Sequence, residues 1–333
     1  MTKTAVVVLN WNGRKLLEEF LPSVVKYSNT PNTKVYLVDN GSTDNSVEFV
    51  KATFPNVELI ILDKNYGFTG GYNKALTLIE AEYFVILNSD VEVTQNWIEP
   101  IINLMDDDKT IAAAMPKIKD YKEKNKFEYA GACGGFIDYL GFPFCRGRIF
   151  NHTEEDKGQY NQTIDVFWAT GACFFIRAEH FINNNGFDPD FFAHMEEIDL
   201  CWRLKNQGYR LICEPKSEVY HLGGGTLSEL NPKKIYLNHR NNLFLLTKNL
   251  PKNKLLSIIF IRMILDAVAA FSYLAKGKPK FFVAVIKAHF SFYSKARYFY
   301  KKRSNTITTH PEMLKKSIVQ QYFLGKKKRY SDL

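Results

Sequence analysis

The amino-acid sequence predicts an α/β protein with a largely parallel central sheet and helices on both faces. Over the first hundred residues, apolar runs typical of buried strands alternate with segments of helical period. Turn-forming and helix-capping residues separate these segments, as expected for short βα and αβ connections. The predicted strands cover 4–10, 34–40, 57–62, 83–90 and 111–118, and the predicted helices cover 14–25, 42–54, 70–81 and 97–105.

The individual elements follow from their residues. "TAVVVLN" (4–10) is a continuous apolar run, whereas 14–25 has apolar residues at 16, 17, 20, 21, 24 and 25, which is the period of a helix. Segment 42–54 begins with "STDNS", which supplies helix-capping side chains. Strand 83–90 ends in the polar residues of "LNSD".

The second half of the sequence is less regular. Residues 119–165 are polar and rich in glycine, which predicts a long irregular insertion or lid. We expect a strand at 165–177, a helix at 198–209 and a strand at 210–215. "VYHLGGGT" (219–226) is expected to follow as a loop.

Length and charge predict two parts. A chain of 333 residues exceeds one typical domain, and we expect a domain at 1–250 and an extension at 251–333. Residues 251–333 carry 18 Lys or Arg and three acidic residues, a charge of +15 within a total of +9. The body is therefore mildly acidic and the extension strongly basic, which suggests an anionic partner for the extension.

The extension is also rich in apolar residues. Segment 255–274 has about the length of a membrane span, but Arg262 and Asp266 lie within it, so we do not predict a span. The lysines, phenylalanines and tyrosines that follow favour helices lying on an anionic membrane surface. The alternative is an ordinary helical extension packed on the body. No nucleic-acid module precedes the extension, so no nucleic-acid partner is expected.

Targeting and redox signals favour the cytoplasm. The N-terminal apolar run is too short for a signal peptide and is interpreted as the first strand. Five cysteines without a CxxC pair argue against a disulfide framework or a zinc site. We therefore expect a cytoplasmic protein held at the inner face of the membrane.

Polar residues at the strand ends are the first functional signal. Asn10, Asp39, Asn65 and Asp90 close or follow successive strands, and ligands of parallel sheets bind beyond these carboxyl ends. There is no P-loop, no GxGxxG after a strand and no GxSxG elbow. "LNSD" places an amide and a carboxylate on one side of an extended segment, which suits Mg²⁺ or Mn²⁺ bridging to phosphates, although an Asx turn would leave the same pattern.

Seven motifs in order resemble the family 2 glycosyltransferases with the GT-A fold, notably the rhamnosyltransferase-like members. The first four are "LNWNG", "DNGSTD", "NYGFTGGYN" and "LNSD". The later ones are "WATGACFFIR", "GFDPDFFAHMEEIDLCWRL" and "VYHLGGGT" with "NHRNN". The resemblance covers about residues 4–245. It implies a GT-A domain and a nucleotide-diphosphate sugar donor, with dTDP- or UDP-sugars favoured.

The resemblance also assigns donor-site roles. Asp90 takes the last position of the family's D-x-D metal motif, with Asn88 where the first acid usually stands. His221 aligns with a histidine that binds the metal in some relatives, although a lone histidine is often structural. The implied cofactor is Mg²⁺ or Mn²⁺. The resemblance places the nucleotide sugar against Asn10, Asp39, Asn65, Gly67, Gly71, Asn73 and Asn88, with Arg240 at the diphosphate.

The implied catalytic base lies in "HMEEIDL". Glu197 stands where the family has the aspartate general base, one methylene longer than usual, and Glu196 is the alternative. Trp168 and His194 are expected to line the sugar or acceptor pocket. Asp199 either binds acceptor or pairs with Arg203 one helical turn on.

The sequence as a whole predicts an inverting, metal-dependent glycosyltransferase that acts on a glycan or lipid-linked acceptor. Processive polysaccharide synthases carry Q-x-x-R-W and several spans, which are absent here, so transfer of one or a few sugars is expected. Two alternatives remain. A degenerate glycan- or nucleotide-binding module would explain the missing aspartates at 88 and 197. A sugar nucleotidyltransferase would need G-x-G-x-R after the first strand, which "NWNGRK" does not match.

Overall fold

A computed structural model describes residues 2–223, 231–303 and 310–333, and its main sheet has nine strands within those residues. The strand order is β11-β13-β6-β12-β4-β1-β2-β3, with β5 paired to β13. The strands are β1 (Thr2–Asn10), β2 (Thr33–Asp39), β3 (Glu58–Ile61), β4 (Ala81–Asn88), β5 (Val91–Val93), β6 (Ile111–Asp120), β11 (Ile164–Asp165), β12 (Cys173–Arg177) and β13 (Arg210–His221).

The N-terminal half of this sheet is parallel, as the sequence predicted. β1 pairs in parallel with β2 and β4, and β2 pairs in parallel with β3. Consecutive residues 4–8 of β1 are all buried, so both faces of the sheet are covered. In register, Asn10 lies beside Asp39 and Leu9 beside Asn88, which brings the polar strand ends to one edge.

The other half of the sheet is mixed. β12 is antiparallel to β4 and β6, β13 is parallel to β6, and β5 and β11 are antiparallel to β13. The strand predicted at 165–177 is in fact two strands, because residues 166–172 leave the sheet between β11 and β12. β13 continues beyond the predicted 210–215 to His221 after a register shift near Glu214. The rest of "VYHLGGGT", from Gly224 on, lies outside the described residues.

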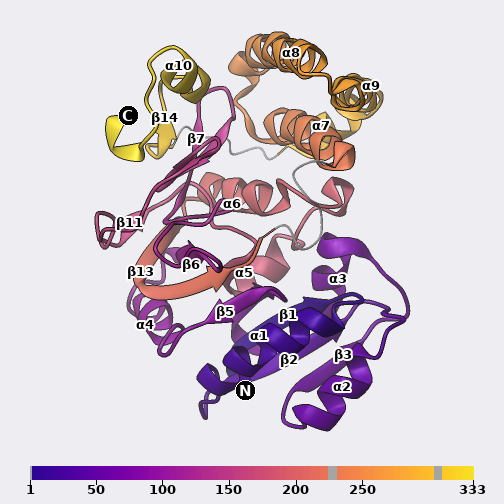
Figure 1. Ribbon diagram of the computed structural model, residues 1–333, viewed down its shortest axis with the longest axis vertical. Coiled ribbons are helices and arrows are strands. Elements are labelled where there is room, and N and C mark those ends of the chain that lie inside the picture. Colours follow the sequence, from indigo (N-terminus) through magenta and orange to yellow (C-terminus); the bar gives the residue numbers. More distant parts are fainter. Residues whose placement is uncertain (1, 224–230, 304–309) are drawn as a thin grey trace.

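The helices lie between and beside these strands (Figure 1). Their amphipathic faces supply the core, as in α1, where Leu17, Phe20, Leu21 and Val24 are buried. The helices are α1 (Arg14–Tyr27), α2 (Ser46–Thr53), α3 (Gly67–Leu76), α4 (Glu99–Asp107), α5 (Ala178–Asn183), η1 (Pro189–Phe191), α6 (Glu196–Asn206), α7 (Pro232–Asn249), α8 (Lys252–Ala275), α9 (Pro279–Lys301), α10 (Ile318–Phe323) and η2 (Tyr330–Asp332).

The segment 119–165, predicted to be an irregular insertion or lid, is largely folded into the core. It forms a small second sheet, in the order β10-β9-β8-β7-β14. Its glycines permit close contacts, since a Cβ on Gly135 would lie 2.2 Å from Trp168 Cδ2. The strands are β7 (Gly135–Asp138), β8 (Pro143–Cys145), β9 (Arg148–Ile149), β10 (His152–Thr153) and β14 (Met313–Leu314).

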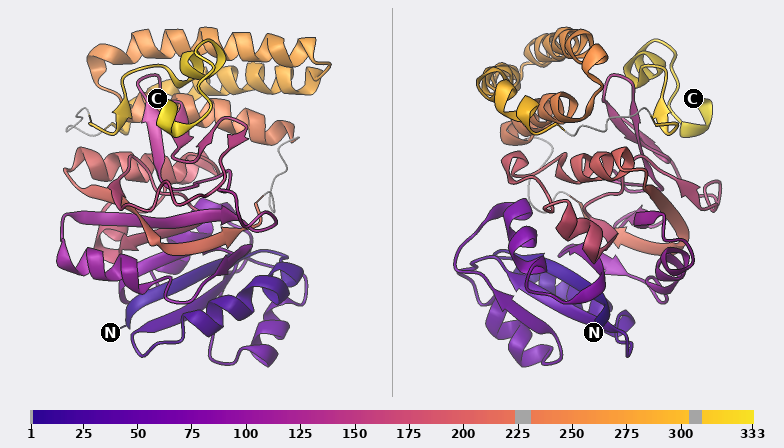
Figure 2. Two further views of the ribbon diagram at one scale, coloured as in Figure 1. Left: turned by 60° about the vertical axis from the view of Figure 1, so that its left-hand side comes forward. Right: turned by 180° about the vertical axis from the view of Figure 1, so that it is seen from behind.

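The C-terminal extension packs against the rest of the chain. α7, α8 and α9 form a helical layer at the end of the molecule opposite β1–β3 (Figures 1 and 2). Arg262 and Asp266 of α8 are buried, and the Asp266 carboxylate contacts His239 of α7 at 3.0 Å and His289 of α9 at 3.2 Å. β14 then pairs with β7 of the small sheet. The division at residue 250 stays a prediction.

One face of α8 remains exposed. The exposed apolar side chains follow the helical period along its whole length, and α8 is the one helix among the described residues long and apolar enough to span a membrane. Only 33% of its most apolar window is buried. The exposed row consists of Leu256, Phe260, Ile264, Val268, Phe271 and Leu274, and it is called the α8 apolar face below.

Candidate active site

The candidate site lies where the carboxyl ends of β1, β2 and β4 face the beginning of α6. A cavity of about 230 Å³ opens there and is called the donor cavity. It collects residues from segments far apart in the sequence, as expected at the carboxyl edge of an α/β sheet. Its lining comprises Phe68, Asn88, Asp90, Ala130, Thr170, Gly171, Ala172, Ala193, His194, Glu196, Glu197, His221 and Lys234.

Asn10 and Asp39 form one polar corner of the sheet edge. Asn10 Nδ2 donates to Asp39 Oδ1 and to Ser42 Oγ, at 3.2 Å each, and the Ser42 amide donates to Asp39 Oδ2 at 2.9 Å. Asn10 Oδ1 is buried without a partner among the described residues. An unpaired buried acceptor is costly, so this corner has capacity for one further donor.

The "NYGFTGGYN" motif builds the neighbouring loop and α3. Asn40 Nδ2 donates to Asn65 Oδ1 at 3.1 Å, and Asn65 Oδ1 also accepts from the Gly67 amide at 2.7 Å. Gly67 has φ +71°, and a Cβ on Gly71 would lie 2.9 Å from Leu9 Cδ1. Asn73 exchanges two hydrogen bonds with the Phe187 backbone, which ties α3 to the segment before α6. These residues fix the shape of the main sheet's carboxyl edge through hydrogen bonds and close packing.

Asp90 and His221 meet at the wall of the donor cavity. His221 Nε2 lies 3.2 Å from Asp90 Oδ1, and its Nδ1 lies 3.3 Å from Glu128 Oε1. All three side chains are buried. Burial lowers the pKa of His221, but the Asp90 and Glu128 carboxylates outweigh it and raise the pKa to about 10.

The chemistry of this pair fits a divalent cation once His221 is neutral, because the imidazole Nε2 has to lose its proton to act as a ligand. Two ligands at about 2.1 Å from one ion and at right angles would be about 3 Å apart. The separation of Asp90 Oδ1 and His221 Nε2 is close to this value, and Asn88 Nδ2 is 3.5 Å from His221 Nε2. Within the described residues no group of three or more His, Cys, Asp or Glu has metal-ligating geometry. The remaining ligands would therefore come from substrate phosphates and water, as is usual for Mg²⁺.

Glu196 and Glu197 occupy the first turn of α6. The chain reaches them through backbone in the positive-φ region at Phe192, His194 and Met195, with φ of 68°, 69° and 73°. Such a run of non-glycine residues is strained and is typical of functional sites. Oε2 of each glutamate is buried and has no hydrogen-bond partner among the described residues.

Burial controls the protonation of both glutamates. It raises the pKa of Glu197 to about 7, against opposing hydrogen bonds from nearby backbone amides. Burial, with the neighbouring Glu197 charge, raises the pKa of Glu196 well above its usual value. A carboxyl that titrates near neutrality is suited to general base catalysis.

A second cavity, of about 290 Å³, also has Glu197 in its lining and is called the aromatic cavity. It shares Ala130, His194, Glu197 and Lys234 with the donor cavity. Trp168, whose Nε1 donates to the Phe136 carbonyl, lies in its wall. The full lining is Tyr129, Ala130, Pro143, Phe144, Arg148, Phe150, Trp168, His194, Met195, Glu197, Ile198, Lys234 and Asn238.

Eight residues assigned from the resemblance line neither cavity, namely Asn10, Asp39, Asn65, Gly67, Gly71, Asn73, Asp199 and Arg240. The first six lie at the strand ends, in the loop before α3 and in α3, and the last two are held elsewhere. Asp199 is fully buried and bonded to Arg203 at 2.8 Å, Lys248 at 2.7 Å and Asn249 at 2.9 Å. Lys248 and Arg203 overcome the effect of burial and lower its pKa to about 2. This geometry corresponds to the structural alternative for Asp199. Arg240 donates to the carbonyls of Asp190 and Phe191.

Several residues at or beside the cavities were not predicted from the sequence. Arg148 of the aromatic cavity and Glu128, which contacts His221 but lines neither cavity, lie in the segment interpreted as an insertion. Lys234, which lines both cavities, lies in the first turn of α7. The sequence offered little signal for them, because single charged residues in polar segments are common. The two arginines of "CRGR" (145–148) were the one local feature near Arg148.

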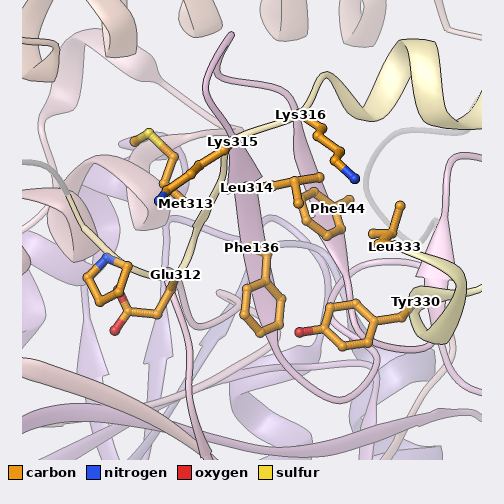
Figure 3. A pocket seen from close by; sticks show the side chains of 10 residues that line it. Phe136, Phe144, Glu312, Met313, Leu314, Lys315, Lys316, Tyr330 and Leu333 are labelled. Carbon is orange, nitrogen blue, oxygen red and sulfur yellow. The ribbon is translucent and has the colours of Figure 1, made fainter.

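A third cavity, of about 440 Å³, lies between the small sheet and the C-terminal segment (Figure 3). Phe136, Phe144 and Tyr330 form its base, and Lys315 and Lys316 come from the segment after β14. None of the residues predicted for the site lines it. Phe144 also lines the aromatic cavity, so the two cavities share one wall residue.

Comparison with known proteins identifies the class. The model of the family "Glycosyl transferase family 2" matches residues 5–183, more than half of the chain. The chain therefore belongs to glycosyl transferase family 2, as the motifs predicted, and it is a glycosyltransferase.

Curated relatives include rhamnosyltransferases. The N-acetylglucosaminyl-diphospho-decaprenol L-rhamnosyltransferase of Mycobacterium tuberculosis is 25% identical over 232 residues, covering 65% of this chain and 75% of that protein. The rhamnosyltransferase WbbL of Escherichia coli K12 is 26% identical over 164 residues, covering 47% of this chain and 61% of that protein. These matches support a rhamnosyltransferase-like member of the family.

Solved structures confirm the GT-A fold. GalNAc-T7 with UDP, GalNAc and Mn²⁺ matches at TM-score 0.59 and 16% identity, over 91% of this chain and 55% of that chain. The mannosyltransferase PcManGT of Pyrobaculum calidifontis, with GDP-Man and Mn²⁺, matches at TM-score 0.53 and 15% identity. The match covers 90% of this chain and 83% of that chain.

Proposed function

We propose that this enzyme is an inverting, metal-dependent glycosyltransferase with Glu197 as its general base. It would move a sugar from a nucleotide-diphosphate sugar to a hydroxyl of a glycan or lipid-linked acceptor. The observation that carries this proposal is the position of Glu197. Its side chain lines both the donor cavity and the aromatic cavity, whereas Glu196 lines the donor cavity alone.

A base between two cavities suits a single displacement. The acceptor hydroxyl, in the aromatic cavity, would give its proton to Glu197 while its oxygen forms a bond to the anomeric carbon. The bond from that carbon to the nucleoside diphosphate breaks, and the electron pair leaves with the diphosphate on the opposite face. Glu197 is one methylene longer than the aspartate usual in the family, and its pKa of about 7 keeps a basic fraction at neutral pH.

Asp90 and His221 would hold the divalent cation on the donor side. When bound, Mg²⁺ or Mn²⁺ would neutralise charge on the departing diphosphate. The names of GalNAc-T7 and PcManGT mention Mn²⁺ together with a nucleotide or nucleotide sugar, which supports this part of the proposal. Asn10, Asp39 and Asn65 lie at the edge where the nucleoside would bind, and dTDP- or UDP-sugars are favoured as donors.

The acceptor side would face the cytoplasmic surface of the membrane. The mycobacterial relative is named for a decaprenol-linked acceptor, which favours a lipid-linked acceptor here. The α8 apolar face and the exposed Lys252, Lys254, Lys276 and Lys278 at its two ends suit an anionic lipid surface. Burial of Arg262 and Asp266 against the body favours a helix lying on the membrane over one crossing it.

The test is substitution of each glutamate by glutamine. Glu197→Gln should reduce transfer by at least about 10²–10⁴-fold, the usual contribution of a general base, while nucleotide-sugar binding survives. Glu196→Gln should retain more transfer, and the exposed Glu179→Gln is the matched control. Retained turnover in Glu197→Gln would contradict the assignment.

A thermal-shift screen of UDP-, dTDP- and GDP-sugars with Mn²⁺ or Mg²⁺ would identify the donor and the metal.

Metal-dependent hydrolysis of the best donor separates this proposal from a degenerate binding module. A catalytic site should release nucleoside diphosphate slowly even without acceptor, because water can take the place of the acceptor hydroxyl. A binding module would bind the donor and leave it intact. Release of pyrophosphate from a nucleoside triphosphate and a sugar phosphate would instead indicate a nucleotidyltransferase.

A further inference from the structure

The aromatic cavity contains a buried cation that no described carboxylate pairs. Arg148, on β9, is 8% exposed. Its Nη1 donates to the Phe150 carbonyl at 3.2 Å, its Nη2 lies 3.5 Å from Cys145 Sγ, and its Nε has no hydrogen-bond partner among the described residues. A buried charge is normally paired, because removing it from water is costly. Arg148 is therefore an exception that a bound anion would explain.

The nearest acidic group is already engaged. Glu128 Oε1 contacts His221, and its Oε2 accepts from the Ala130 amide. The guanidinium of Arg148 instead lies 4.3 Å from the ring centre of Tyr129, a contact that stabilises a cation without neutralising it.

A second cation lies in the same cavity. Lys234, in the first turn of the 18-residue helix α7, lines both the aromatic cavity and the donor cavity. It forms no ion pair with a carboxylate in the part of the chain that the structure describes. The backbone amides at the start of a helix add to a positive potential there. Among the described residues, the cavity thus brings together two cations that no carboxylate pairs and one acidic group, Glu197.

The remaining lining is aromatic and apolar. Tyr129, Phe144, Phe150 and Trp168 supply ring faces, which suit the C–H face of a sugar ring or an apolar chain. A neutral glycan would leave the Arg148 charge uncompensated. A phosphorylated acceptor would place its sugar hydroxyl at Glu197 and its anionic group at Arg148 and Lys234.

We infer that Arg148 and Lys234 form a binding subsite for a phosphate or diphosphate group on the acceptor. This inference rests on the proposed function, because it takes the aromatic cavity as the acceptor site. Arginine is suited to this role, since its planar fork matches the oxygens of a phosphate. The subsite would select acceptors in which a phosphate or diphosphate adjoins the sugar that is extended.

Binding of decyl diphosphate tests the subsite directly. The full-length protein is first saturated with nucleoside diphosphate and Mn²⁺, so that the donor side is filled, and binding is then measured by calorimetry. Decyl maltoside serves as the uncharged probe. Arg148→Gln should weaken decyl diphosphate binding about tenfold to a hundredfold, as expected for loss of charge-assisted hydrogen bonds. It should leave decyl maltoside binding unchanged, and Arg148→Lys should restore part of the affinity.

Lys234→Gln gives a second measurement that does not depend on the fold of the small sheet. It should weaken decyl diphosphate binding severalfold, and Arg210→Gln, at an exposed surface ion pair, should not. Equal losses for both probes in Arg148→Gln, or no loss in either variant, would overturn the subsite. Absence of decyl diphosphate binding to the unmodified protein would overturn it too. Nucleotide and Mn²⁺ binding, measured in the first step, reports on the proposed function separately.

Discussion

The two sides of the site are held together by different kinds of contact. On the donor side, the polar residues bond to one another across adjacent loops, as in Asn10 to Asp39 and Asn40 to Asn65. Behind the acceptor side, outside both cavities, buried charges are paired between residues far apart in the sequence. Lys248 contacts both Asp188 and Asp199, and Lys302, just after α9, contacts Asp188 at 2.8 Å. The polar strand ends of the donor side are thus built from consecutive βα units, with His221 added from β13, while the charges behind the acceptor side are paired by the C-terminal helices.

This difference suggests distinct consequences of mutation. Donor-side substitutions should affect nucleotide and metal binding first, because these side chains line or adjoin the donor cavity. Substitutions in the ion-pair network behind the acceptor side should affect stability first. The predictions below set one side against the other.

Asp90→Asn, on the donor side, should lower activity by a large factor. Loss of the carboxylate removes the most strongly charged ligand of the proposed cation, which supplies several kcal/mol of transition-state stabilisation. We expect kcat/KM to fall by about 10³-fold, with Mn²⁺ affinity, measured by electron paramagnetic resonance, falling in parallel. Asp63→Asn, an exposed aspartate on the same side, is the control. Full activity of Asp90→Asn without added metal would contradict metal dependence.

The polar residues at the strand ends could be predicted from the sequence because their signals are local, while their roles stay predictions. Asp39 and Asp90 stand next to strands whose apolar runs are unambiguous, and parallel strands necessarily bring their carboxyl ends to one edge. The glutamates of α6 were found through the family motif, since composition alone also allowed a solvated helix start.

The acceptor side could not be predicted in the same way. Arg148 lies on a two-residue strand, and its environment depends on Tyr129 and on β8, which are set by tertiary pairing. Likewise, the sequence around Lys248 does not indicate its ion pair with Asp199, 49 residues earlier. Long-range pairing of this kind follows from how elements pack and leaves no periodic signal.

Asp199→Asn should have the largest effect on stability. Its carboxylate is fully buried and compensates Arg203 and Lys248, so that the substitution leaves the buried Lys248 and the partly buried Arg203 each with one carboxylate fewer. Removing one partner of a buried pair typically costs about 3–5 kcal/mol. Urea denaturation should show this loss, against about 1 kcal/mol or less for Asp165→Asn, whose pair with Arg210 is exposed. A loss for Asp199→Asn as small as the control would contradict the structural role.

The pH dependence of kcat should report on Glu197. The base must be ionised, and its pKa of about 7 means that the rate falls about tenfold per pH unit below that value.

The stability of the folded protein should change with pH in the opposite sense to the rate. Because folding raises this pKa, the buried ionised form destabilises the protein as pH rises through about 7. Glu197→Gln should therefore raise the melting temperature at pH 8 and lose this advantage below pH 4.5. A flat rate profile between pH 5 and 7 would contradict the assignment.

The α8 apolar face should make a smaller contribution, confined to the acceptor side. Leu256 on α8 is 82% exposed and Leu78 on the donor side is 68% exposed, so each can be replaced by serine with little effect on the fold. If α8 lies in the membrane surface, Leu256→Ser loses about 1.5–3 kcal/mol of burial, and partition to anionic vesicles should fall about tenfold to a hundredfold. Leu78→Ser should leave partition unchanged.

Sedimentation with vesicles of increasing anionic lipid content measures the partition of both variants. Binding should strengthen with anionic content, because the lysines near the ends of α8 contribute about 1 kcal/mol each. Equal partition of the two variants would show that the acceptor side meets the membrane through another surface, and absence of binding by the unmodified protein would remove the membrane from the proposal.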